Sequence, residues 1–90
     1  MVADIMVKLT REFQVTVFSP FETFYNGPAV AVTAESSVGK FDILYGHANF
    51  LSLLVPCEVK VRTVQEEKTM EIKRGILQVA DNTVWLFANI

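Results

Sequence analysis

A single histidine, His47, is the residue of this 90-residue chain best suited to acid–base chemistry near neutral pH. It lies in the segment GKFDILYGHANF, residues 39–50, which also holds two of the four glycines. No nucleophile stands at a spacing known from hydrolases, because Ser52 follows five residues later and Cys57 ten residues later. The sequence favours a structural or interface histidine, and a small hydrolase built on His47 is the weakest alternative.

Metal and nucleotide chemistry are also poorly provided for. A zinc site needs three or four ligands, and the chain offers one His, one Cys and scattered carboxylates. The Gly39-Lys40 pair resembles the end of a phosphate-binding loop, but Ala34 replaces its first glycine and Phe41 its Ser or Thr. We predict no catalytic, cofactor-binding or metal-binding residues, and we interpret Gly39 as a turn residue with a positive φ.

The composition indicates a small domain with more apolar residues than its own core can bury. Hydrophobic residues make up 51% of the chain, whereas a domain of this size buries only roughly 60% of the surface of its unfolded chain. We therefore expect part of the apolar surface to contact a partner. The net charge of −2 and the scattered Lys and Arg argue against a nucleic-acid partner.

Compartment and domain count follow from similar observations. The single Cys57 cannot form an intramolecular disulfide, as expected in a reducing compartment. Charged residues interrupt the first twelve positions, so we expect no secretory signal. The most apolar run, residues 48–57, is about half the ~20 residues of a membrane-spanning helix. We predict one domain over residues 1–90, with residues 1–11 as a flexible or edge-covering segment and no direct membrane insertion.

Alternation of apolar and polar residues predicts strands along most of the chain, and no stretch has helical periodicity. The residues predicted to face inward are Phe13, Val15 and Val17, then Val30, Val32 and Ala34, then Val59 and Val61, then Met70 and Ile72. The predicted turns are at Ser19-Pro20, Asn26-Gly27-Pro28, Gly46 and Gly75. We predict an all-β fold, a small antiparallel two-sheet β-sandwich of about eight to ten short strands.

The last third of the chain predicts a hairpin. Residues 75–88 contain two apolar runs separated by Asp81-Asn82, which tolerate turn conformations. The final run is apolar on both faces, because Trp85 and Phe87 alternate with smaller apolar residues. A sandwich strand has one inward face, so Trp85 and Phe87 are left either for a covering loop or N-terminal segment, or for another protein.

Half of the eighteen charged residues, eight basic and ten acidic, fall between Glu58 and Arg74. Their positions alternate with the apolar residues of the strands predicted there. This pattern is more typical of a solvated hairpin than of a charged binding site.

The order of these segments over about residues 13–89 resembles the N-terminal β-sandwich domain of the epsilon subunit of F-type ATP synthase. The most specific elements are Gly39-x-Phe41-x-Ile43-Leu44-x-Gly46-His47-Ala48 and, at the expected distance, Gly75-Ile76-Leu77-x-Val79. Ser19-Pro20 and Tyr25-Asn26-Gly27 stand where that family has its first hairpin. Departures from the family pattern are Lys40, Asp42, Tyr45, Asn49 and Lys73-Arg74. Lys40 stands where the family commonly has an acidic residue, so either the partner loop has changed its charge, or the family contact rests on backbone and apolar groups.

The resemblance implies a non-catalytic subunit of the central stalk in a proton- or sodium-translocating ATP synthase. Such a subunit docks the gamma subunit and the ring of membrane subunits, coupling ion flow to ATP synthesis. The implied place is peripheral, at the cytoplasmic face of the bacterial inner membrane, within the complex. We expect no counterpart of the family's C-terminal helical hairpin in these 90 residues.

The resemblance also implies two interfaces. The ring-facing residues would be Val38, Gly39, Lys40, Phe41, Tyr45, Gly46 and His47. The gamma-facing residues would be Ser19, Trp85 and Phe87. The alternative is a stand-alone β-sandwich module for a peptide or carbohydrate, for which Trp85 near Asn82 and Asn89 is the one indication.

Overall fold

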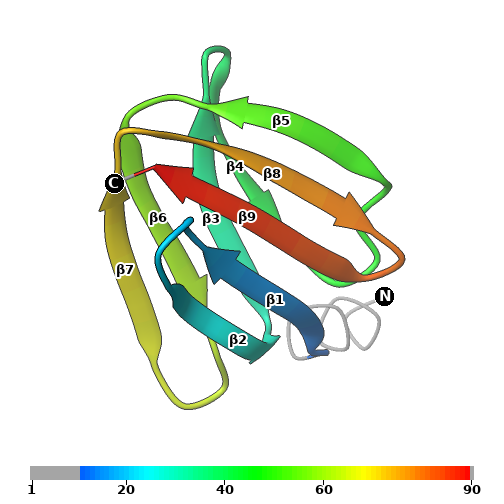
Figure 1. Ribbon diagram of the computed structural model, residues 1–90. Coiled ribbons are helices and arrows are strands. Elements are labelled where there is room, and N and C mark those ends of the chain that lie inside the picture. Colours follow the sequence, from blue (N-terminus) through cyan, green and yellow to red (C-terminus); the bar gives the residue numbers. More distant parts are fainter. Residues whose placement is uncertain (1–10, 90) are drawn as a thin grey trace.

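The computed structural model describes residues 11–89, which form two packed β-sheets (Figure 1). The strands are β1 Phe13–Phe18, β2 Thr23–Ala29, β3 Ala31–Ser36, β4 Gly39–Ile43, β5 Phe50–Leu54, β6 Cys57–Arg62, β7 Glu67–Ile72, β8 Arg74–Ala80 and β9 Thr83–Asn89. This part of the chain contains no helix that could cross a membrane. The predicted all-β sandwich is confirmed, while the predicted N-terminal segment, apart from Arg11, lies outside the described residues.

The two sheets differ in strand number and in how their strands connect. The five-stranded sheet has the order β2-β1-β9-β8-β5, and the four-stranded sheet has the order β4-β3-β6-β7. Neighbouring strands are antiparallel with one exception, because β1 and β9 run parallel from Gln14 opposite Thr83 to Phe18 opposite Phe87. The first and last strands of the described chain thus meet inside one sheet.

The core lies between the sheets and is built by the period-2 pattern of the strands. Side chains with almost no exposure include Val15, Val17, Val32, Ala34, Val59, Val61, Leu77, Val84, Leu86 and Ala88. The described core contains no buried polar or charged residue. All the residues predicted to face inward are buried, except Met70, which is half-buried and packs against the core.

Two of the predicted turns are wrong. Asn26, Gly27 and Pro28 lie inside β2, and Gly75 lies inside β8. Pro28 has no N–H to donate to a neighbouring strand. It is tolerated here because β2 is an edge strand, with a neighbour on one side only. The side-chain oxygen of Asn26 also accepts a hydrogen bond from Gln14 Nε2 at 2.8 Å, which joins β2 to β1.

Gly75 serves close packing. A Cβ at this position would lie 2.6 Å from the carbonyl oxygen of Phe87 on the neighbouring β9. The glycine therefore permits the approach of the two strands, and the chain passes between the sheets one residue after Ile72, at Lys73.

The remaining turn predictions hold. Asp81 and Asn82 connect β8 to β9 with φ angles of 51° and 56°, the left-handed pair that a two-residue hairpin requires. Gly39 has the predicted positive φ, 133°, and Gly46 has a φ of 83°. Both glycines occupy backbone conformations that residues with a Cβ rarely adopt.

Candidate interaction surfaces

The outer face of the five-stranded sheet carries a continuous apolar row across four strands. Leu53 of β5 is opposite Ile76 of β8, Ile76 is opposite Phe87 of β9, and Phe87 is opposite Phe18 of β1. We call these four residues the apolar row. Leu53 is 72% exposed and Ile76 44% exposed. Since the adjacent residues of each strand point into the core, the side chains of the apolar row point outward from the sandwich.

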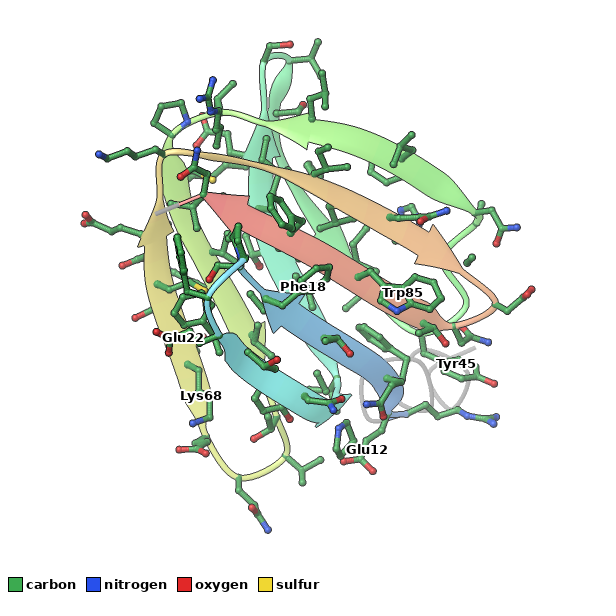
Figure 2. The ribbon with its side chains drawn as sticks, in the orientation of Figure 1. Glu12, Phe18, Glu22, Tyr45, Lys68 and Trp85 are labelled. Atoms are coloured by element: carbon green, nitrogen blue, oxygen red, sulfur yellow. The ribbon has the colours of Figure 1, made fainter. Side chains whose placement is uncertain are left out.

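Aromatic side chains strengthen this face. The rings of Phe18 and Phe87 meet edge to face at 5.4 Å. Trp85 lies two residues before Phe87 on β9 and is 41% exposed. Figure 2 shows it on the same side of the sheet as Phe18. Over the described residues no loop covers the Trp85 ring enough to bury it, so the covering loop considered from the sequence is not found there.

Phe87 separates two hollows at the end of the sheet. One, of about 350 Å³, is bounded by the turn from Ser19 to Glu22 and by Phe87, and the other, of about 360 Å³, by Leu53, Arg74 and Ile76. The three residues predicted to face gamma thus share one face of the molecule. The sequence missed Phe18, Ile76, Leu51 and Leu53. For Ile76, Leu51 and Leu53 the signal was the one seen in the final strand, apolar residues at both alternating positions of FLSLL and GILQV. For Phe18 it was an apolar residue at an outward position at the end of FQVTVF.

The residues predicted to face the ring form a turn, a strand and a turn, but they do not converge. Val38 stands at the tip of the β3–β4 turn and is 94% exposed, with Gly39 and Lys40 next to it. This turn projects at the top of Figure 1, whereas Tyr45 and Gly46 follow the opposite end of β4. A contact with both groups would have to run along the length of the strand.

The second group is attached to the β8–β9 turn. The N–H of Gly46 donates to Asn82 Oδ1 at 2.8 Å, and the N–H of Asp81 donates to Asn49 Oδ1 at 3.3 Å. The guanidinium of Arg11 lies 4.3 Å from the centre of the Tyr45 ring. Figure 2 shows Tyr45 at this end of the molecule.

His47 belongs to an aromatic cluster with Phe50 and Phe41. Its ring packs edge-on against Phe50 at 5.4 Å, and Phe50 packs in the same way against Phe41. The Nδ1 atom lies 2.8 Å from the carbonyl oxygen of Ala48. Among residues 11–89 there is no group of three His, Cys, Asp or Glu side chains that could hold a metal ion.

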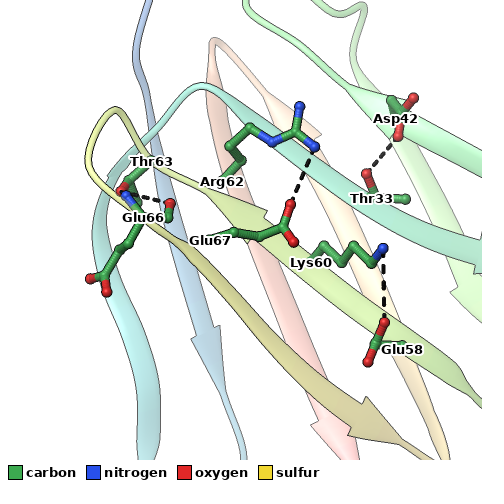
Figure 3. A network of polar contacts seen from close by, with 8 residues as sticks. All are labelled: Thr33, Asp42, Glu58, Lys60, Arg62, Thr63, Glu66 and Glu67. Atoms are coloured by element: carbon green, nitrogen blue, oxygen red, sulfur yellow. Dashed lines mark hydrogen bonds and ion pairs between the residues drawn. The ribbon is translucent and has the colours of Figure 1, made fainter.

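The outer face of the four-stranded sheet is polar. Exposed ion pairs join Arg62 to Glu67 at 3.2 Å and Lys60 to Glu58 at 3.9 Å, and Thr33 donates to Asp42 at 2.6 Å (Figure 3). Pairs of this kind contribute roughly 0–1 kcal/mol each, because water screens them. The charged segment from Glu58 to Arg74 is a solvated hairpin, as its alternation predicted, and the two outer faces of the sandwich are chemically opposite.

Burial shifts the pKa values of Tyr25 and Cys57. Partial burial, with smaller contributions from the carboxylates of Glu12 and Glu66, raises the pKa of Tyr25, whose hydroxyl donates to the carbonyl oxygen of Pro28. Burial likewise raises the pKa of the Cys57 thiol. Both groups are therefore held in their neutral forms near neutral pH.

Comparison with known proteins agrees with this architecture. The model of the family described as "ATP synthase, Delta/Epsilon chain, beta-sandwich domain" matches residues 12–90. The ATP synthase epsilon chain of Clostridium novyi (strain NT) is 33% identical over 72 residues, which cover 79% of this chain and 55% of that protein. The epsilon chain of Ruminococcus albus is 31% identical over 72 residues, covering 80% of this chain and 54% of the relative. The chain thus spans about half the length of these relatives.

Solved structures show the same fold. A chain in the cryo-EM structure of the Euglena gracilis mitochondrial ATP synthase superposes with a TM-score of 0.80, covering 86% of this chain and 50% of that one, at 21% identity. A chain of the Tetrahymena thermophila mitochondrial ATP synthase central stalk and c-ring gives a TM-score of 0.77 over 90% of this chain and 66% of that one, also at 21% identity. The strand pattern, the sandwich and the family match together show that this chain belongs to the β-sandwich domain family of ATP synthase delta and epsilon chains.

Proposed function

We propose that this chain acts as a non-catalytic epsilon subunit in the central stalk of a rotary ATP synthase, and that it docks the gamma subunit through the apolar row. The observation that carries the proposal is the cross-strand line of Leu53, Ile76, Phe87 and Phe18 on the outer face of the five-stranded sheet. The similarity to epsilon chains and to a chain of the solved Tetrahymena thermophila central stalk and c-ring supports the assignment to this complex.

The face has the anatomy of a protein interface. Aromatic and aliphatic side chains form its centre, and Gln14, Gln78 and Arg74 lie on exposed positions around them. Fully burying one large apolar side chain contributes about 1.5–3 kcal/mol. The row and Trp85 therefore offer several such contributions, against which the entropy cost of association must be set.

A second contact, with the membrane ring, is proposed at the β3–β4 turn. Val38 is almost fully exposed there and Lys40 is also exposed, whereas the Tyr45-Gly46 turn is hydrogen-bonded to Asn82. With both contacts the domain would transmit rotation between ring and gamma, so that ion flow drives ATP synthesis. The complex would hold the chain peripherally at the cytoplasmic face of the bacterial inner membrane.

A carbohydrate- or peptide-binding module is not favoured. The sequence indication for sugar binding was Trp85 near Asn82 and Asn89, but the Asn82 side-chain oxygen already accepts the N–H of Gly46. The Asn82 side-chain oxygen therefore holds a loop in place.

The test is a calorimetric titration of the chain with its cognate gamma subunit. Phe87→Lys places a charge in the centre of the apolar row and is expected to weaken binding at least tenfold. The matched control, Thr69→Lys, changes an exposed position of β7 on the opposite sheet and should leave the affinity within about twofold. Circular dichroism checks that both variants fold. Absence of binding by the unmodified chain, or equal weakening by both variants, would contradict the proposal.

A further inference from the structure

The five-stranded sheet ends at β5, and this edge lacks the features that protect the other three edges. The edge strand β2 contains Gly27 and Pro28, β7 contains Glu67, Lys68 and Glu71, and β4 contains Lys40 and Asp42. Charges and prolines discourage the addition of a further strand. The sequence of β5, FLSLL, has no charge, no proline and no glycine.

The backbone groups of β5 that face away from the sheet can be identified. Val55, directly after β5, donates its N–H to the carbonyl oxygen of Glu35 on β3, in the direction away from β8. Alternate residues of a strand direct their N–H and C=O to the same side. The N–H and C=O groups of Leu53 and Leu51 therefore also point to the open edge.

These groups are available for pairing. The carbonyl oxygen of Leu53 accepts a hydrogen bond of 3.3 Å from the hydroxyl of the adjacent Ser52. Among residues 11–89, no backbone bond from another element reaches Leu51 or Leu53 at this edge. Leu51 and Leu53 are 67% and 72% exposed. Among residues 11–89, β3 lies beside β5 where the N–H of Val55 bonds to Glu35, at the end of this edge.

We propose that the gamma subunit contributes an extended segment that pairs as an additional strand with the edge of β5. This inference rests on the proposed function and extends it from side-chain packing to backbone recognition. Because Leu53 is both the end of the apolar row and part of the open edge, a partner seated on the row reaches this edge without a gap. The N–H and C=O groups of Leu51 and Leu53 supply up to four hydrogen bonds, and apolar residues at alternate positions of the partner strand lie beside the two leucines.

The direct test is hydrogen exchange of the Leu51 and Leu53 amides, followed by NMR in the free chain and in its complex with gamma. We expect fast exchange in the free chain and at least tenfold slower exchange in the complex. The amide of Leu77, in the sheet interior on β8, should be protected in both states and serves as the internal reference.

A pair of variants separates backbone pairing from packing. Leu53→Pro removes both the side chain and the outward N–H, whereas Leu53→Ala removes only the side chain. We expect the proline variant to bind gamma at least tenfold more weakly than the alanine variant. If the proline variant does not fold, the exchange measurement on the unmodified chain decides.

The outcomes distinguish the two proposals. Gamma binding that is sensitive to Phe87→Lys but leaves the Leu51 and Leu53 amides unprotected would overturn strand pairing and leave the docking face intact. Failure of gamma to bind at all would overturn both. Protection of these amides that rises with concentration in the free chain would assign the edge to a second copy instead, which also overturns the inference.

Discussion

The side-chain oxygen of Asn82 accepts the N–H of Gly46 at 2.8 Å, although the two residues are 36 positions apart in the chain. Asn82 also has a φ of 56°, so one residue forms the β8–β9 turn and holds the loop after β4. With the bond from Asp81 to Asn49, this attaches the connection between β4 and β5 to the β8–β9 turn at one end of the sandwich.

Replacing Asn82 should therefore separate its two roles. Asn82→Gly keeps a backbone that tolerates positive φ but loses the acceptor, and we expect a loss of about 1 kcal/mol in the free energy of unfolding. Asn82→Asp keeps an acceptor oxygen and should stay closer to the unmodified chain. Urea denaturation measures both, and a glycine variant as stable as the parent would show that the bond to Gly46 contributes nothing.

Gly75→Ala should be destabilising by about 1–3 kcal/mol, because its Cβ would lie 2.6 Å from a backbone oxygen of β9. Gly27→Ala is the matched control. The three atoms nearest its Cβ would belong to the Tyr25 side chain, at 3.2 Å from the hydroxyl, and not to the backbone, so a smaller loss of stability is expected. Thermal unfolding of both variants checks the prediction, and equal transition temperatures would contradict the close approach at Gly75.

Tyr25 should make stability fall at alkaline pH. Its folded pKa is raised above the ordinary value of 10.0, so its stabilising effect is complete below that pH and is lost as the pH rises through the folded pKa. In Tyr25→Phe this component is absent, together with the hydrogen bond to Pro28. The difference in unfolding free energy between the two proteins should shrink when urea titrations are repeated from pH 8 to pH 11, and a difference that stays constant would refute the assignment.

Binding to the ring should be sensitive at one end of β4 only. Val38→Asp changes the exposed tip of the β3–β4 turn, and Ala48→Asp makes the same kind of change at an exposed position beyond the opposite end. We expect only Val38→Asp to reduce co-purification of the chain and gamma with the detergent-solubilised ring, by at least fivefold. The reverse result would transfer the contact to the His47 end.

The alternation of apolar residues sufficed to predict the strands, because burial of one face imposes period 2 on each of them. The β8–β9 hairpin was predicted from its turn residues, because Asp81 and Asn82 tolerate the positive φ angles that the turn requires. The pattern misled at Pro28 and Gly75, whose residue types are typical of turns. Pro28 is tolerated in a strand because β2 is an edge strand, and Gly75 is required because β9 passes close to it. Both reasons depend on tertiary structure, which the local pattern does not contain.

The candidate surfaces were predicted less completely. Trp85 and Phe87 stood out because one strand was apolar on both faces, but their continuation through Ile76 to Leu53 depends on strand order and register. The sequence also did not show that the predicted ring-facing residues lie at the two ends of β4. Val38 and Tyr45 are close in sequence, but the extended strand between them places them far apart.

The parallel pairing of β1 with β9 makes the assembly of the domain dependent on its last-synthesised part. β9 lies between β1 and β8, so without it the five-stranded sheet consists of two separate strand pairs, β1 with β2 and β5 with β8. On the ribosome, this sheet cannot close until residues 83–89 have left the exit tunnel. Folding is then a late event governed by contacts distant in sequence, and it is expected to be slow for a domain of this size.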